Sequence, residues 1–235
     1  MTFRCAELSL ELNEPRAGTA PVAARWELVE RAKPWGREHG LVSEGAKVLL
    51  VRRISGSEPQ SPEGRRYLVC TNGARDPCCA IRGPAVAQAL DRVRPGQVYE
   101  CSHLGGHRFA ANVLVLPDGL CFGRLDARAA PTLVDALDEG QLPLEHLRGR
   151  TAFEPAQQAA EILVRRELGL TGLDDLRLQG VGGSEPPTVF ELADGRRVAV
   201  RLHAEPLQTQ RVSCRDEKVE APTKWTLSEL VALSH

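Results

Sequence analysis

Residues 67–101 read YLVCTNGARDPCCAIRGPAVAQALDRVRPGQVYEC, and this stretch decides the fold. The apolar run at 67–70 predicts a strand, and three apolar residues at helical spacing predict a helix over residues 84–93. Pro84 suits the first turn of that helix, and a Pro-Gly pair follows its last residue. A second strand is expected at 97–101. The stretch therefore predicts a strand-helix-strand unit whose intervening loop carries cysteines.

The chain continues from this unit into a strongly apolar segment. Residues 109–116 are expected to form a strand, and a Pro-Asp-Gly turn joins them to a shorter strand at 120–123. A helix is expected at 130–139. The order over residues 67–140 is then strand, helix, three strands and helix. Helices packed on a mixed sheet would bury these elements, so we expect an α/β fold, a thioredoxin-like α/β sandwich.

Fewer patterns describe the two ends of the chain. The remaining expected elements are strands at 26–30, 47–51 and 211–215, a helix at 151–168, and a hairpin of strands 188–192 and 198–202. A capping-box pattern at Thr226–Glu229 predicts a last short helix. We therefore expect two domains: residues 1–150 form the thioredoxin-like domain, and residues 151–235 form a small C-terminal α+β appendage.

Composition narrows the class of protein. The chain has 235 residues, of which 42% are hydrophobic, and 30 Lys+Arg against 31 Asp+Glu give a net charge of −1. Such a balance creates no global field toward nucleic acid or an anionic membrane, so neither is expected as a partner. The N-terminal residues lack the apolar stretch of a secretory signal, which predicts a cytoplasmic protein. In that reducing compartment the seven cysteines bind metal, react or pack.

Four residues are the candidate metal ligands. Cys70 and Cys79 lie nine positions apart, and His103 and His107 lie four apart around a Gly-Gly pair. The ends of the two strands of a strand-helix-strand unit are neighbours, so two thiolates and two imidazoles are expected to converge. Such a donor set suits either tetrahedral zinc or a [2Fe-2S] cluster. The spacing leaves both open.

The other five cysteines are less suited to bind the metal. Cys78 is an alternative to Cys79, although the nine-residue spacing favours Cys79. Cys101 is expected to pack, or to contact the metal group without binding it. Cys5, Cys121 and Cys214 are interpreted as small core or surface residues.

Two sequence blocks resemble the sucrase/ferredoxin-like family. They are VCTNGARDPCCA at 69–80 and ECSHLGGHRFAANVLVLP at 100–117, and the resemblance extends over residues 16–125. It implies a thioredoxin-like ferredoxin with a [2Fe-2S] cluster, held by Cys70 and Cys79 on one iron and by His103 and His107 on the other. The resemblance is what favours iron over zinc.

The expected function is electron transfer. A [2Fe-2S] cluster carries one electron, and the sequence indicates no substrate pocket, so an electron carrier is favoured over an enzyme. The expected partners are proteins that donate and accept electrons, whose identity the sequence does not give. Two alternatives are a zinc-binding structural or interaction protein and a thiol-disulfide oxidoreductase. The last lacks the Cys-x-x-Cys pair at a helix start that usually activates a thiol.

Overall fold

The structure is a computed structural model, and it describes residues 51–54, 64–73, 77–102, 104–179, 187–211, 217 and 219–233. The strand expected at 26–30 and most of the one expected at 47–51 lie outside these residues. Val51 belongs to a described strand. His103 also lies outside the described part of the chain.

A six-stranded mixed sheet forms the first part of the molecule, in the order β1-β3-β2-β4-β5-β6. Its strands are β1 (Val51–Arg53), β2 (Arg66–Cys70), β3 (Val98–Cys101), β4 (Val113–Leu116), β5 (Leu120–Phe122) and β6 (Leu147–Arg150). Strands β2 and β3 run parallel, and every other neighbouring pair is antiparallel. The expected strand-helix-strand unit followed by a hairpin is confirmed.

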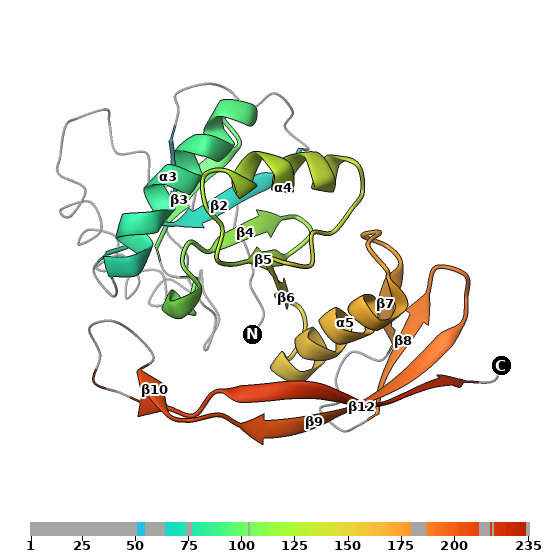
Figure 1. Cartoon of the computed structure of the whole chain (residues 1–235). Coiled ribbons are helices and arrows are strands. Elements are labelled where there is room, and N and C mark those ends of the chain that lie inside the picture. Colours follow the sequence, from blue (N-terminus) through green and yellow to red (C-terminus); the bar gives the residue numbers. More distant parts are fainter. Residues whose placement is uncertain are drawn as a thin grey trace, which may run out of the picture.

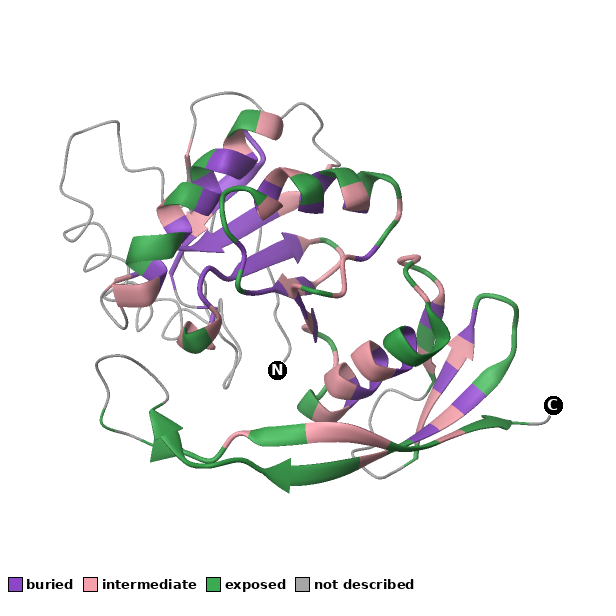
Figure 2. Cartoon of the chain, in the orientation of Figure 1, coloured by how far each residue is buried: buried purple, intermediate pink, exposed green. Residues whose placement is uncertain are grey.

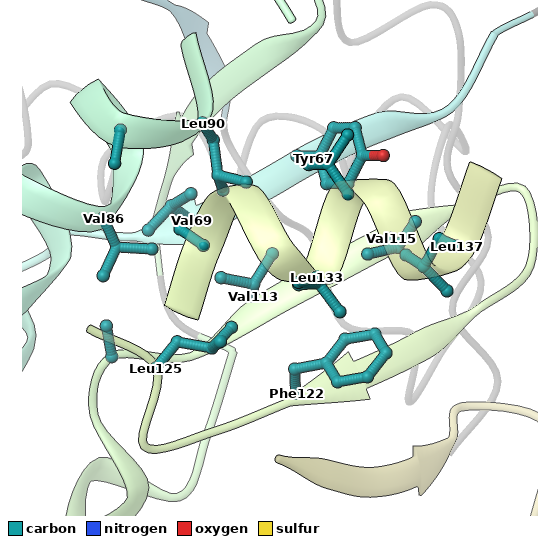
Figure 3. Close-up of a cluster of buried hydrophobic side chains, with 14 of the residues drawn as sticks. Tyr67, Val69, Val86, Leu90, Val113, Val115, Phe122, Leu125, Leu133 and Leu137 are labelled. Carbon is teal, nitrogen blue, oxygen red and sulfur yellow. The ribbon is translucent and has the colours of Figure 1, made fainter. Parts of the chain in front are cut away.

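Two helices, α3 (Pro77–Val93) and α4 (Ala129–Asp138), cover one face of this sheet (Figure 1). Val86 and Leu90 of α3 and Leu133 of α4 pack on strand residues such as Val113, and all of them are buried (Figure 3). The apolar residues that alternate with these along the same strands, including Leu68 and Leu114, belong to a second buried cluster. The mixed sheet covered by helices confirms the expected α/β class.

The start of α3 differs from the prediction. The helix begins at Pro77, seven residues before the expected Pro84, which lies inside it. Proline suits the first helical position because its missing N–H has no intrahelical partner there, whereas inside a helix it removes a hydrogen bond. The chain has a proline at both places, and the prediction chose the wrong one. Cys78 and Cys79 consequently lie in the first turn of a helix and not in a loop.

The strand expected at 109–116 is also shorter than predicted. Residues His107–Phe109 form a short 3-10 helix, η1, and β4 begins only at Val113. Ala110 and Ala111 are apolar because they are buried in a bend between the two elements. Burial without pairing looks the same in sequence as a buried strand.

A four-stranded sheet forms the second part, in the order β12-β9-β8-β7, and the helix α5 packs on it. The elements are α5 (Pro155–Leu168), β7 (Leu176–Gln179), β8 (Thr188–Leu192), β9 (Arg197–Pro206), β10 (Gln210–Arg211), β11 (Val219–Glu220) and β12 (Thr223–Leu233). The last predicted helix is wrong, because Thr226–Glu229 lies within β12. Ten residues of β12 pair with β9, and this long ladder overrides a local capping pattern.

The strands β9 and β12 extend beyond α5 as an exposed two-stranded ribbon (Figure 2). The strand expected at 211–215 is described only at Arg211, the last residue of β10, which pairs with β11. In the described part of the chain, no helix combines the length and apolar character needed to cross a bilayer.

A buried ion network joins the two parts. Glu161 of α5 accepts hydrogen bonds from Arg150 at 3.0 Å and from Arg165 at 3.1 Å, both on Oε1. Arg165 and Arg150 also donate to the carbonyl oxygen of Leu173. The network ties the last strand of the first sheet to α5. The domain boundary expected at residue 150 stays a prediction. In the structure, β6 ends at this residue.

We predict that Glu161→Gln destabilises the protein strongly. Glu161 and Arg165 are both fully buried, and neutralising the carboxylate leaves the buried Arg165 charge without its counter-charge. Loss of one partner of a buried pair costs about 3–5 kcal/mol of unfolding free energy. Urea denaturation followed by circular dichroism measures this change.

Arg196→Gln is the matched control, because the Arg196–Asp194 pair is exposed and should contribute less than about 1 kcal/mol. Equal effects of the two substitutions would contradict a structural role for the buried network.

Candidate functional site

Cys70 ends β2 in the buried interior. Its Sγ donates a hydrogen bond to the carbonyl oxygen of Ser102 at 3.2 Å. Cys70 also lies opposite Cys101 in the parallel pairing of β2 with β3. The ends of the two strands of the strand-helix-strand unit are therefore adjacent, as the sequence predicted.

Cys79 and His107 meet beside these strand ends. Cys79 is the third residue of α3 and is 1% exposed, while His107 is the half-buried first residue of η1. Their closest polar atoms, Sγ and Nδ1, are 3.7 Å apart. Cys70 and Cys79 belong to the same buried cluster. The structure thus brings three of the four predicted ligands to one region.

A close approach of α3 to β2 places Cys79 there. A Cβ atom added at Gly83 would lie 2.3 Å from the carbonyl oxygen of Cys70, so only glycine fits. Glycine inside a helix costs about 0.5–1 kcal/mol of stability relative to alanine. The absence of a side chain at Gly83 is therefore what this position requires. The contact holds the first turn of α3 against the end of β2.

The loop before His107 is held from the opposite side by Arg148 of β6. Arg148 Nη1 donates to the Asn112 Oδ1 at 2.9 Å and to the carbonyl oxygen of Gly105 at 3.3 Å. Asn112 Nδ2 in turn donates to the carbonyl oxygen of Gly106 at 3.1 Å. Gly106 has a φ of 68°, and a Cβ there would lie 2.5 Å from Arg148. These contacts fix the backbone from which His107 projects.

Arg148 also determines the electrostatics of the site. Burial lowers the pKa of Arg148, while the nearby thiols of Cys121 and Cys79 act in the opposite direction. Arg148 thus places a positive charge near the thiols of Cys121 and Cys79.

Thr71, next to Cys70, has a buried hydroxyl oxygen with no hydrogen-bond partner among the described residues. A buried hydroxyl without a partner costs free energy, and such groups are rare in folded proteins. Cluster sulfides and metal-bound thiolates accept hydrogen bonds of this kind. The orphaned hydroxyl is therefore consistent with an acceptor that belongs to a bound group.

The other sequence predictions are resolved only in part. His103 is outside the described residues, so its place relative to the other three stays a prediction. Within the described residues, no three side chains of His, Cys, Asp or Glu are grouped closely enough to hold one metal ion. Cys101 is buried, as expected for a packing residue. Cys78 and Cys121 are half-buried.

Sequence reasoning missed Arg148 and Asn112. Arg148 lies 41 positions after His107 in an alternating strand and looks like one of many surface cations. Asn112 lies in a segment predicted as a strand, where a polar residue is ordinarily solvent-facing. Only the pairing of β5 with β6 brings Arg148 to the site, and no local signal predicts it.

A family model described as sucrase/ferredoxin-like matches residues 16–149, more than half of the chain. The chain belongs to this family. The sequence resemblance, which extended over residues 16–125, is thereby confirmed.

Similar proteins include three named "Altered inheritance of mitochondria protein 32". Identity is 31% with that of Eremothecium gossypii, over 37% of this chain and 32% of the relative. It is 27% with that of Meyerozyma guilliermondii, over 39% of this chain and 36% of the relative. The chain thus spans about a third of the length of these two relatives.

Similar solved structures include a thioredoxin-like [2Fe-2S] ferredoxin from Aquifex aeolicus. Its TM-score is 0.34 at 18% identity, over 40% of this chain and 96% of that chain. A structure of the wild-type ferredoxin has a TM-score of 0.33 at 18% identity, over 37% of this chain and 99% of that chain.

We predict that Gly83→Ala disturbs the site. The added methyl group must push α3 away from β2, which moves Cys79 relative to Cys70. Such overpacking costs about 1–3 kcal/mol. Urea denaturation measures the loss, and metal content per chain should fall in parallel. Gln88→Ala, at an exposed position of the same helix, should leave both unchanged. An equally stable, metal-replete Gly83→Ala protein would show that the close approach is not required.

We predict that Arg148→Gln loosens the His107 loop. The shorter amide cannot reach both Gly105 and Asn112, so bound metal should be lost to a chelator about tenfold faster, equivalent to about 1.4 kcal/mol. Arg124→Gln is the matched control, because Arg124 is exposed and donates no side-chain hydrogen bond to a described residue. Equal release rates for the two variants would contradict the positioning role.

Proposed function

We propose that this protein transfers single electrons through a [2Fe-2S] cluster held by Cys70, Cys79, His103 and His107. The observation that supports the proposal most directly is that Cys70 and Cys79, from β2 and α3, belong to one buried cluster at the strand ends, with His107 beside it. Membership of the sucrase/ferredoxin-like family adds to it.

The donors fit such a cluster in kind. Two buried thiols and an imidazole come from three different elements, and the orphaned hydroxyl of Thr71 is a donor suited to a sulfide. A bound [2Fe-2S] cluster supplies a one-electron redox couple. The chain's own residues bind it, exclude water from it through the apolar side chains of Leu104 and Ala110, and orient His107 through Arg148.

Zinc is a second candidate because of one distance. Two ligands on a tetrahedral zinc ion, with bonds of about 2.3 Å to sulfur and about 2.05 Å to nitrogen, lie about 3.6 Å apart. The separation of 3.7 Å between Cys79 and His107 is close to that value. In the proposed cluster these two residues bind different irons and need not lie so near each other. A zinc-stabilised interaction protein is therefore the alternative to be tested.

Thiol chemistry remains the third candidate. Cys79 lies in the first turn of α3, where the helix dipole stabilises a thiolate. A thiol-disulfide enzyme also needs a second cysteine poised to resolve the mixed disulfide, and the usual Cys-x-x-Cys spacing is absent from this sequence. Fast reaction of one thiol with an electrophile, in a protein that is purified without bound metal, would favour this candidate.

Partners and compartment follow from the electron-transfer proposal. The partners would be proteins that donate and accept electrons, and neither nucleic acid nor membrane is proposed. We propose the cytoplasm as the compartment, because reducing conditions keep cysteine ligands available.

We predict that the protein purified without oxygen contains two irons and two sulfides per chain, absorbs visible light and gives an EPR signal once reduced. Substituting Cys70 or Cys79 by serine, or His103 or His107 by alanine, should abolish these features. Cys78→Ser is the matched control, since it removes the neighbouring thiol and should keep the cluster. A colourless protein with one bound zinc would replace the leading proposal with the second candidate.

A further inference from the structure

A group of arginines surrounds one aromatic ring next to His107. The guanidinium carbon atoms of Arg108, Arg148 and Arg124 lie 4.8, 4.9 and 5.3 Å from the centroid of the Phe109 ring. Arg108 and Arg124 are exposed, while Phe109 and Arg148 are half-buried. We call Arg108, Arg124, Arg148 and Phe109 the arginine patch. It is built from η1, from the residues after β5 and from β6.

No carboxylate of the described residues neutralises the charges of the patch. Among the described residues, neither Arg108, Arg124 nor Arg148 forms an ion pair with a carboxylate. Arg108 instead acts on Arg148 as a like charge and contributes to the lowered pKa of that residue, after the larger effect of burial. Stacking on an aromatic face offsets only part of the repulsion between such cations. Repelling cations held together without counter-charges are typical of a surface that binds an anionic partner.

A fourth arginine extends the patch. Arg82, exposed on α3, donates a hydrogen bond to the carbonyl oxygen of Ala110 at 3.4 Å, directly after Phe109. The positive surface therefore reaches from β6 across η1 to α3, the helix that carries Cys79. The whole chain has a net charge of only −1, so this concentration is local.

We propose that the arginine patch, with Arg82, is the docking surface for an acidic electron-transfer protein. The inference rests on the proposed function and names the partner of the same site. Arg108 directly follows His107, so a protein bound at the patch would lie beside a predicted ligand. Arginine and aromatic side chains are enriched at the energetic centres of protein interfaces. Exposed guanidinium groups suit a flat acidic protein surface.

The test uses an acidic flavodoxin in its two-electron-reduced form as the electron donor and follows reduction of the full-length protein by stopped-flow spectroscopy. Arg108→Gln/Arg124→Gln removes the two exposed charges of the patch. We expect its second-order rate constant at low salt to be about tenfold below that of the parent protein, with a weaker dependence on ionic strength. Arg108→Lys/Arg124→Lys should retain most of the rate.

Two controls separate docking from other effects. Arg177→Gln/Arg197→Gln removes two exposed charges from the C-terminal sheet and should leave the rate unchanged. Reduced methyl viologen, a small cation, should reduce the glutamine variant at least as fast as the parent protein. Equal rates with flavodoxin for the parent and the Arg108/Arg124 variant, or equal slowing by both glutamine pairs, would overturn the docking surface.

Failure of the proposed function would be distinguished by calorimetry. Titration of the full-length protein with the same flavodoxin measures docking whether or not iron is present. The purified protein could contain no iron while the Arg108→Gln/Arg124→Gln variant still binds flavodoxin more weakly than the parent protein does. That result would support the docking surface and overturn the electron-transfer proposal. Undiminished binding by that variant would overturn the docking surface alone.

Discussion

The close contact between α3 and the end of β2 is the constraint on which the site depends. The carbonyl oxygen of Cys70 occupies the space that a side chain at Gly83 would need. Because the helix can approach this closely, its first turn reaches the strand ends, and Cys79 joins the buried cluster that contains Cys70. The parallel pairing of β2 with β3 then brings the chain after Cys101 to the same place. A larger residue at position 83 would push α3 away from β2 and separate the two cysteines.

Sequence periodicity was sufficient for the elements of this unit but not for their ends. Alternating and helical patterns predicted β2, β3, β5 and α4 to within two residues, because their buried faces repeat regularly. The start of α3 failed because two prolines each suited a first turn. The helix expected at Thr226–Glu229 failed because β9 supplies a ten-residue partner from elsewhere in the chain. In the second case a non-local contact decided between two locally acceptable structures.

The candidate site was predictable to a similar extent. Cysteine and histidine are scarce and chemically distinctive, so their spacing in two loops identified the ligand candidates. The residues that hold those ligands are ordinary ones, and their roles arise from tertiary structure. Arg148 reaches Gly105 only because β6 pairs with β5, and Gly83 matters only because Cys70 lies behind it. Support of this kind cannot be read from one sequence, because nothing local separates such an arginine or glycine from the rest.

Arg148 connects the chemistry of the site with its surface. Its guanidinium group holds the loop before His107, lies near the thiol of Cys79 and stacks on the same phenylalanine as Arg108 and Arg124. One side chain therefore contacts the predicted ligand loop and the charged surface beside it. The exposed arginines add charge that metal binding alone does not need. Two such cations kept side by side lower stability unless a partner neutralises them, and this excess favours a protein that acts through contact with an acidic neighbour.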